Sequence, residues 1–332
     1  MLTIDGRVGE GGGQILRSSL ALSCITRRAM KLVNIRANRS KPGLRPQHLA
    51  CVRAAAQISG AKVRGDAVNS RELEFRPKKV RSGDFGFQVG TAGSAALVLQ
   101  TVLLPLALHG DRRSTVRIGG GTHNDKAPPV TFLQRAWLPR LHAMGLDVEV
   151  ELERPGFYPK GGGSLVCSVR PSRPKRLELS KRGQKQAIRA HVVMSGLPRA
   201  AAEEALSALR CQLSLDHEDV QDFRGPPGLA VMVEVESRNV TELFGGLANR
   251  GRNIEGAATG AACAALAYLA QPEPVGEHLA DQLMLPMALG EGGAFRSVPP
   301  SLHTTTNADI IRRFLDVDIT FRDGEVRIEP DA

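Results

Sequence analysis

The stretch VGEGGGQILRSSLAL, residues 8–22, is followed twice along the chain by a similar one: VGTAGSAALVLQTVL at residues 89–103 and VGEHLADQLMLPMAL at residues 275–289. Gly9 aligns with Gly90 and Gly12 with Gly93, and the apolar positions coincide. Each stretch begins with a turn-like glycine step and continues with apolar residues at helical spacing. The sequence therefore predicts three copies of one structural unit, each opening with an amphipathic helix.

The residues that follow each copy extend the pattern outward. A short strand candidate comes next, then a polar loop and a second helix. The three loops are RANRSKPGLRPQ (36–47), GGGTHNDKAPP (119–129) and PPSLHTTTN (299–307). The expected second helices are 46–59, 129–144 and 307–314, and strands 147–152 and 316–321 close the units. This alternation predicts an α/β (α+β) fold with helices packed on sheets, and three similar loops meeting at one composite site.

Residues from about 181 to 273 do not follow the repeat. KRGQKQAIRAHVVMSG (181–196) and LAVMVEVES (229–237) are typical of strands, whereas residues 198–213 and 256–270 are typical of helices. We therefore expect two domains: a large one of three repeats formed by residues 1–180 and 275–332, and a smaller inserted α/β domain at 181–274.

The composition limits the class of protein. The chain has 332 residues, of which 42% are hydrophobic, and a formal net charge of +10. A cationic protein of this size suits nucleic acids, nucleotides or anionic membranes, and charge alone does not choose among them. No uncharged apolar run reaches about 18 residues, so no membrane-spanning helix is expected. The chain has five cysteines: Cys24, Cys51, Cys167, Cys211 and Cys263. No two of them form a CxxC motif, and their spacing does not match a zinc site, so we expect reduced core cysteines in a cytoplasmic protein.

The glycine run Glu10-Gly-Gly-Gly-Gln14-Ile-Leu-Arg17 is the strongest local signal for chemistry. Glycines let backbone amides approach a phosphate, and the helix that follows adds its positive N-terminal dipole. Arg17 can supply charged hydrogen bonds, and Glu10 can ligate a divalent cation through oxygen. The alternative is a glycine turn that only joins a strand to a helix. The run is not a Walker A loop, because GxxxxGK[ST] occurs nowhere in the chain.

The other loops contain further candidate residues. Around Pro42-Gly43, the first loop contains four cationic side chains and one amide that could bind an anion: Arg36, Arg39, Lys41, Arg45 and Gln47. The alternative is that this loop is only a solvated basic surface. In the third loop, His303 stands between Leu302 and three threonines, where an imidazole can act as a nucleophile or general base. A lone histidine is more often structural, but His303 falls in the loop that corresponds to the basic loop of the first unit. His123 in the second loop is a second candidate, and Asp281 could orient a metal or a ribose.

The run GFYPKGGG at residues 156–163 resembles a phosphate loop. A strand-like segment, LVCSVRP, follows it directly, so we interpret the run as a tight turn that opens a strand.

These motifs together resemble those of the RNA 3′-terminal phosphate cyclases along essentially the whole chain. The stretches that carry the resemblance occur in the family's order: DGRVGEGGGQILR, RANRSKPGLRPQHL, GTAGSAALVLQTVL, APP, GFYPKGGG, VGEHLADQLMLPMAL and SLHTTTN. The resemblance implies three repeated βαβα units like the C-terminal domain of a translation initiation factor, with a smaller α/β domain inserted. It also implies a cytoplasmic ligase of RNA processing that uses ATP and Mg²⁺ or Mn²⁺ and acts on RNA 3′-phosphate ends.

The family's chemistry implies a role for each matching residue. A histidine takes AMP from ATP, passes it to the RNA 3′-phosphate, and the neighbouring O2′ then closes a 2′,3′-cyclic phosphate. His303 matches the nucleophile and Glu10 the metal ligand. Arg17, Arg39 and Gln47 match phosphate contacts, and Gln100 and Asp281 match the nucleotide site. Pro128 matches the proline on one face of adenine, while His278 stands where some members have a tyrosine on the other face.

Two other functions compete with this interpretation. One is a non-catalytic relative that serves ribosome assembly, but such relatives lack the histidine that this chain has at position 303. The other is an enolpyruvyl transferase, which uses two domains of three units each and is longer. No membrane partner is expected, and an oligomer is possible.

Overall fold

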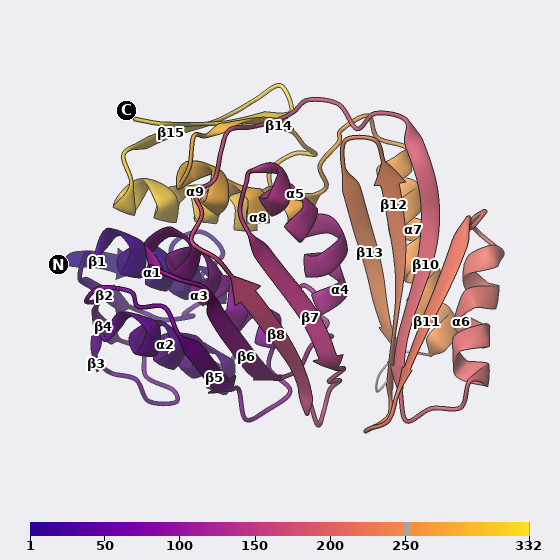
Figure 1. Ribbon diagram of the computed structural model, residues 1–332, viewed down its shortest axis with the longest axis horizontal. Coiled ribbons are helices and arrows are strands. Elements are labelled where there is room, and N and C mark those ends of the chain that lie inside the picture. The colour runs from indigo at the N-terminus through magenta and orange to yellow at the C-terminus, as the bar shows by residue number, and fades with distance from the viewer. Residues whose placement is uncertain (249–252, 332) are drawn as a thin grey trace.

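The computed structural model describes residues 1–248 and 253–331 and has the mixed α/β architecture that the sequence predicts (Figure 1). Four sheets of four strands each are present within those residues. The expected inserted segment 181–274 includes residues 249–252, which lie outside the described part, as does Ala332.

Three of the sheets share one strand order. The first has the order β1 (Leu2–Asp5), β2 (Met30–Val33), β4 (Leu73–Arg76), β3 (Lys62–Arg64). The second has the order β5 (Asp84–Gln88), β6 (Ser114–Gly120), β8 (Gly163–Val169), β7 (Val148–Arg154). The third has the order β9 (Leu177–Leu179), β14 (Gly293–Arg296), β16 (Glu325–Pro330), β15 (Val317–Arg322). In each, the first pair is parallel and the next two pairs are antiparallel.

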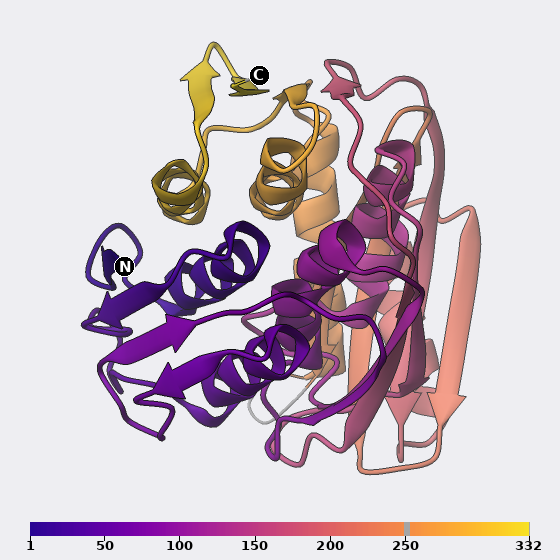
Figure 2. The same ribbon diagram turned by 60° about the vertical axis from the view of Figure 1, so that its left-hand side comes forward.

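The helices occupy equivalent places in the three segments that form these sheets. In each segment, one helix lies between the two strands of the parallel pair, and another follows the second of these strands. They are α1 (Gly13–Thr26) and α2 (Pro46–Ser59); α3 (Ala95–His109) and the continuous run α4 (Val130–Phe132), η1 (Leu133–Trp137) and α5 (Leu138–Ala143); and α8 (Glu277–Ala288) and α9 (Leu302–Phe314). Helix α1 packs on α3 and α9, and α9 packs on α8. Figure 2 shows α8 and α9 between the yellow C-terminal strands and α1. The beginnings of α1 and α9 therefore meet, although they are far apart in sequence.

The fourth sheet is formed by the chain between β9 and α8. Its order is β11 (His217–Phe223), β10 (Lys185–Ser195), β12 (Gly228–Ser237), β13 (Thr241–Ala248). Helices α6 (Ala200–Arg210) and α7 (Ile254–Leu269) cover its outer face and share a hydrophobic cluster with it (Figure 1). Its other face contributes Val193, Ala230 and Met232 to the main hydrophobic core. This sheet thus has its own core and also forms a wall against the rest of the protein.

Most predicted element bounds lie close to the observed ones. Helix 46–59 agrees at both ends, and the helical run at 130–143 contains a π-helical turn. The expected loop 299–307 is wrong, because α9 already begins at Leu302. The Ser301 hydroxyl caps this helix by accepting the N–H of Thr304 at 3.3 Å. The hydroxyls of Thr305 and Thr306 return hydrogen bonds to carbonyls one turn back, which lets a threonine run be helical.

The five cysteines are free thiols, as expected, but two of them are not in the core. Cys24, Cys51 and Cys167 are buried, whereas Cys211 and Cys263 are exposed. The error at Cys263 arises because α7 is alanine-rich, so its sequence marks the buried face only weakly. Within the described ranges, no helix is long and apolar enough to cross a membrane.

Candidate active site

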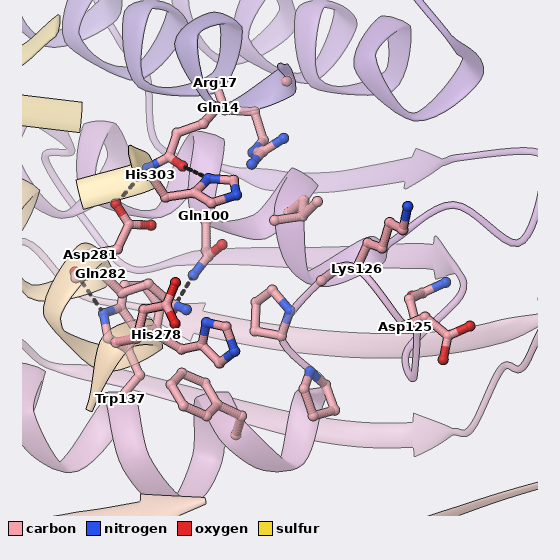
Figure 3. Close-up of a pocket in the computed structure, with 18 of the residues that line it drawn as sticks. Gln14, Arg17, Gln100, Asp125, Lys126, Trp137, His278, Asp281, Gln282 and His303 are labelled. Carbon is pink, nitrogen blue, oxygen red and sulfur yellow. Dashed lines mark hydrogen bonds between the residues drawn. The ribbon is translucent and has the colours of Figure 1, made fainter. Parts of the chain in front are cut away.

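A cavity of about 840 Å³ lies where α1, α2, α8 and α9 begin, and β13 closes one side of it. All nine site residues predicted from the sequence line this cavity: Glu10, Arg17, Arg39, Gln47, Gln100, Pro128, His278, Asp281 and His303. Figure 3 shows several of them pointing into the same space from different helices. The fold therefore gathers segments from both ends of the chain into one place.

The glycine turn before α1 packs directly on α9. Gly9 has a φ of +58°, and a side chain there would overlap the hydroxyl of Thr306. The same hydroxyl accepts the N–H of Glu10 at 3.0 Å. Glycine is required here both for its backbone conformation and for this close approach. The contact places Glu10 beside His303, which is one turn of helix before Thr306.

A chain of hydrogen bonds fixes the His303 ring. The Nε2 of Gln14 donates to Oδ1 of Asp281 at 2.6 Å, so the amide oxygen of Gln14 faces His303 (Figure 3). That oxygen lies 2.8 Å from Nδ1 of His303, which must therefore carry the hydrogen. The unprotonated nitrogen is then Nε2, and the His303 side chain is 50% exposed on the cavity. An imidazole held in this tautomer is prepared to act as a nucleophile.

Asp281 lies behind Gln14 and is buried. Its Oδ1 also accepts the side-chain N–H of Asn307 at 3.1 Å, and Asn307 in turn accepts from Ser18 at 2.8 Å. Burial raises the pKa of Asp281, while the hydrogen bond from Gln14 and the positive charge of Arg17 oppose that rise. In the structure the side chain of Asp281 orients Gln14, and its expected role toward a metal or a ribose stays a prediction. Gln14 and Asn307 lie within recognised motifs, yet sequence reasoning gave neither a role.

Glu10 provides a carboxylate that fits a divalent cation. Its side chain is 9% exposed and forms an ion pair with Arg39. Its Oε2 lies 3.2 Å from Nδ1 of His303, but the one hydrogen on that nitrogen belongs to the shorter contact with Gln14. Oε2 thus has no hydrogen-bond partner among the described residues. Those residues also contain no group of three or more potential metal-ligating side chains. A hard cation here would take one protein carboxylate and complete its shell with phosphate oxygens and water, as Mg²⁺ commonly does.

Arg17 is a partly buried cation that forms no ion pair with a carboxylate among the described residues. Its guanidinium makes no hydrogen bond or ion pair within the part of the chain that the structure describes, and burial lowers its pKa. Gln47 uses its oxygen to accept the N–H of Ser94 at 2.9 Å, which leaves its amide hydrogens for a ligand. An anion beside Arg17 would give the guanidinium a direct hydrogen-bonded partner, which the described residues do not supply.

The opposite end of the cavity is more apolar. Pro128, Phe132 and Trp137 line it together with His278 on the first turn of α8. Gln100 donates to Oε1 of Gln282 at 2.5 Å, and the indole N–H of Trp137 donates to the Gln282 carbonyl at 3.2 Å (Figure 3). This mixture of rings and amides is the kind of surface that accepts a nucleobase. Gln282 is a further site residue that sequence reasoning missed.

Helix α8 is attached to the fourth sheet through a buried carboxyl group. Glu242 on β13 accepts the N–H of Gly276, the N-cap of α8, at 2.6 Å. Burial raises the pKa of Glu242 to about 8, against the opposing effects of this hydrogen bond and of Arg182. The position of β13 is thereby coupled to the helix that carries His278 and Asp281.

The remaining candidate residues and motifs from the sequence contribute to the fold. His123 is buried outside the cavity, stacks on Phe157 with ring centroids 5.3 Å apart, and has its pKa lowered to about 3 by burial. Residues 156–163 form the expected turn before β8. In the basic loop, Arg36 donates to the carbonyls of Lys41 and Gly43 and so shapes the loop itself.

Comparison with known proteins places these observations in a family. The family model for RNA 3′-terminal phosphate cyclase matches residues 8–321. The RNA 3′-terminal phosphate cyclase of Ectopseudomonas mendocina is 44% identical over 331 residues, covering 98% of this chain and 96% of the relative. Those of Ralstonia nicotianae and Koribacter versatilis are also 44% identical, covering 100% and 98% of this chain and 95% and 93% of the relatives.

Proposed function

The chain belongs to the RNA 3′-terminal phosphate cyclase family, and from this premise we propose that it uses ATP to convert an RNA 3′-phosphate into a 2′,3′-cyclic phosphate through an adenylate on His303. The observation that carries the proposal is the tautomer of His303. Its Nδ1 hydrogen is held by Gln14, so the lone pair of Nε2 is available in the cavity that Glu10 and the arginines also line. The presence of this histidine disfavours a binding protein without catalysis.

In the first step, Nε2 of His303 attacks the α-phosphorus of ATP. The bond from that phosphorus to the bridging oxygen breaks, pyrophosphate leaves, and AMP remains on the histidine. The hydrogen on Nδ1 stays bonded to Gln14, which stabilises the positive charge that develops on the ring. Arg17 and Arg39 line the cavity where negative charge accumulates. A divalent cation, Mg²⁺ or Mn²⁺, held by Glu10 would neutralise phosphate charge there.

In the second step, an oxygen of the RNA 3′-phosphate attacks the adenylyl phosphorus and the bond to Nε2 breaks. AMP is now joined to the RNA by an anhydride, which gives the 3′-phosphate a good leaving group. The neighbouring O2′ then attacks the 3′-phosphorus, the bond from this phosphorus to AMP breaks, and the O2′ proton passes to solvent as AMP leaves. This last reaction is intramolecular, so the correct position of the attacking oxygen is already provided. Arg39 and Gln47 are the residues that we assign to the RNA phosphate.

We place the adenine of ATP between Pro128 and His278, with Gln100 and Asp281 lining the nucleotide site. An imidazole covers less of a purine than the tyrosine that some relatives have at this position, so we expect weaker discrimination by stacking.

The fold supports a proposal on domain organisation. We assign residues 1–180 and 275–332 to a large domain of three initiation-factor-like units, and residues 181–274 to an insertion. The shared strand order of three sheets and the separate core of the fourth sheet support this division.

Labelling with α-³²P-ATP tests the function directly. The wild-type protein with Mg²⁺ should acquire acid-labile, alkali-stable label, and His303→Ala should acquire none. Leu302→Ala is the matched control, because Leu302 is the adjacent residue, is 59% exposed and has no proposed role. Label on His303→Ala would refute the nucleophile, and a folded wild-type protein without label would favour a binding function.

A further inference from the structure

His48, at the third position of α2, has one ring nitrogen committed to the backbone. Its Nδ1 accepts the N–H of Arg45, the N-cap of the helix, at 3.3 Å. Nδ1 is therefore unprotonated, and the hydrogen of the neutral ring is on Nε2. The side chain is 6% exposed and lines the cavity. One side of the ring thus caps a helix, and the other side presents a donor to the active site.

That donor points to the place where Arg17 also points. A Cβ built on Gly13 would lie 2.5 Å from Nε2 of His48 and 2.8 Å from Nη1 of Arg17. The ring and the guanidinium therefore converge beside the first residue of α1. Helix α1 has no side-chain cap, so its first amides are further donors at this point. Within the described residues, no hydrogen bond or ion pair satisfies Arg17.

The environment keeps His48 neutral. Burial is the main cause that lowers its pKa to about 3, and the positive charges of Arg17, Arg36 and Arg45 act in the same direction. A neutral imidazole with a fixed tautomer adds a directed hydrogen bond without adding charge. It cannot serve as a general acid near neutral pH.

We propose that Nε2–H of His48 donates a hydrogen bond to a phosphate oxygen bound by Arg17. The donor set of a neutral ring, a partly buried guanidinium and a helix N-terminus recognises a phosphate oxygen, which belongs either to the triphosphate of ATP or to the RNA 3′-phosphate. This inference rests on the proposed function, because it assumes that these two phosphates enter the cavity. His48 is then a phosphate-binding residue of the same site, with a helix cap as its second role.

The variant His48→Met tests the donor. The methionine sulfur carries no hydrogen and is only a weak acceptor for the N-cap N–H, so the ring donor is lost without any charge being added. His48→Leu, which also has no donor, provides a second variant should the first fail to fold. His142→Met is the control, because His142 is exposed on α5 and outside the cavity. All variants are made in the His303→Ala background, so that binding is measured without chemistry.

Dissociation constants are measured for ATP, for an RNA oligonucleotide with a 3′-phosphate, and for the same oligonucleotide with a 3′-hydroxyl. Losing a hydrogen bond to a charged acceptor should weaken one phosphate ligand roughly ten- to a hundredfold. A loss for ATP assigns the triphosphate, and a loss for the 3′-phosphate RNA alone assigns the RNA end. The ratio of variant to wild-type affinity should be equal at pH 6 and pH 8.

Three results would overturn the inference: unchanged affinity for both phosphate ligands, an equal loss for the 3′-hydroxyl RNA, or a larger loss at pH 6, which would indicate an imidazolium. Because binding is measured without His303, these outcomes do not depend on whether that residue is adenylylated. Absence of label on the wild-type protein would instead refute the proposed function, so the two failures are distinguishable.

Discussion

Replacing Gln14 with leucine should slow adenylylation of His303 without abolishing ATP binding. Leucine has a similar volume but can neither accept from Nδ1 of His303 nor donate to Asp281. The ring then loses the contact that fixes its tautomer, and its developing positive charge loses an acceptor. A hydrogen bond to a charged group contributes about 1.5–3 kcal/mol. The rate of the chemical step should therefore fall about 10- to 150-fold.

The assay measures the rate at which labelled protein forms in rapid-quench experiments. At saturating ATP, this rate reports the rate constant of the chemical step and does not depend on the affinity for ATP. Ser18→Ala is the matched control, since Ser18 is on the same helix and contacts Asn307 but not His303. We expect this control to stay within about fivefold of wild type, because an ordinary hydrogen bond contributes only about 1 kcal/mol. An unchanged rate constant for Gln14→Leu, or a change confined to the half-saturating ATP concentration, would refute the orienting role of Gln14.

Two further predictions follow from buried carboxyl groups. Glu10→Gln should raise the Mg²⁺ concentration needed for half-maximal adenylylation at least about tenfold, because an amide is a weaker ligand for a hard cation, and a metal titration checks this. For Glu242, burial raises the pKa from an ordinary 4.5 to about 8, so the folded protein retains a proton that the unfolded chain releases between these values. Folding stability is therefore lost as the pH rises through this window, by up to about 5 kcal/mol. Glu242→Gln should raise Tm relative to wild type at pH 8.5 and change it little at pH 4.5, whereas a pH-independent difference would contradict the buried carboxyl.

The elements predictable from sequence were those marked by local chemistry. Pro46 fixes the beginning of α2, and the glycine run before Gly13 marks the beginning of α1. The resemblance of ordered motifs named nine of the residues that line the cavity, from Glu10 to His303. The three glycine-led stretches also indicated where the chain would turn into each unit.

What could not be predicted depends on how distant helices pack. The contacts of Gln14 with Asp281 and His303 exist only because α1, α8 and α9 meet, and no local pattern encodes that meeting. A helix cap also accounts for one wrong prediction. The Ser301 hydroxyl caps α9, so residues expected to form a loop form the first turn of this helix. The second role of His48 was hidden for the same reason, because its neighbour Arg17 comes from another helix.

The contact between Gln14 and His303 joins residues 289 positions apart in the chain. A ribosome must therefore synthesise the chain as far as α9 before the nucleophile can reach its orienting partner. Nascent chains, and fragments that end before α9, contain the glycine turn and the arginines but lack the histidine. Such products would be unable to consume ATP in the proposed reaction, so acquisition of AMP would report that synthesis had passed α9.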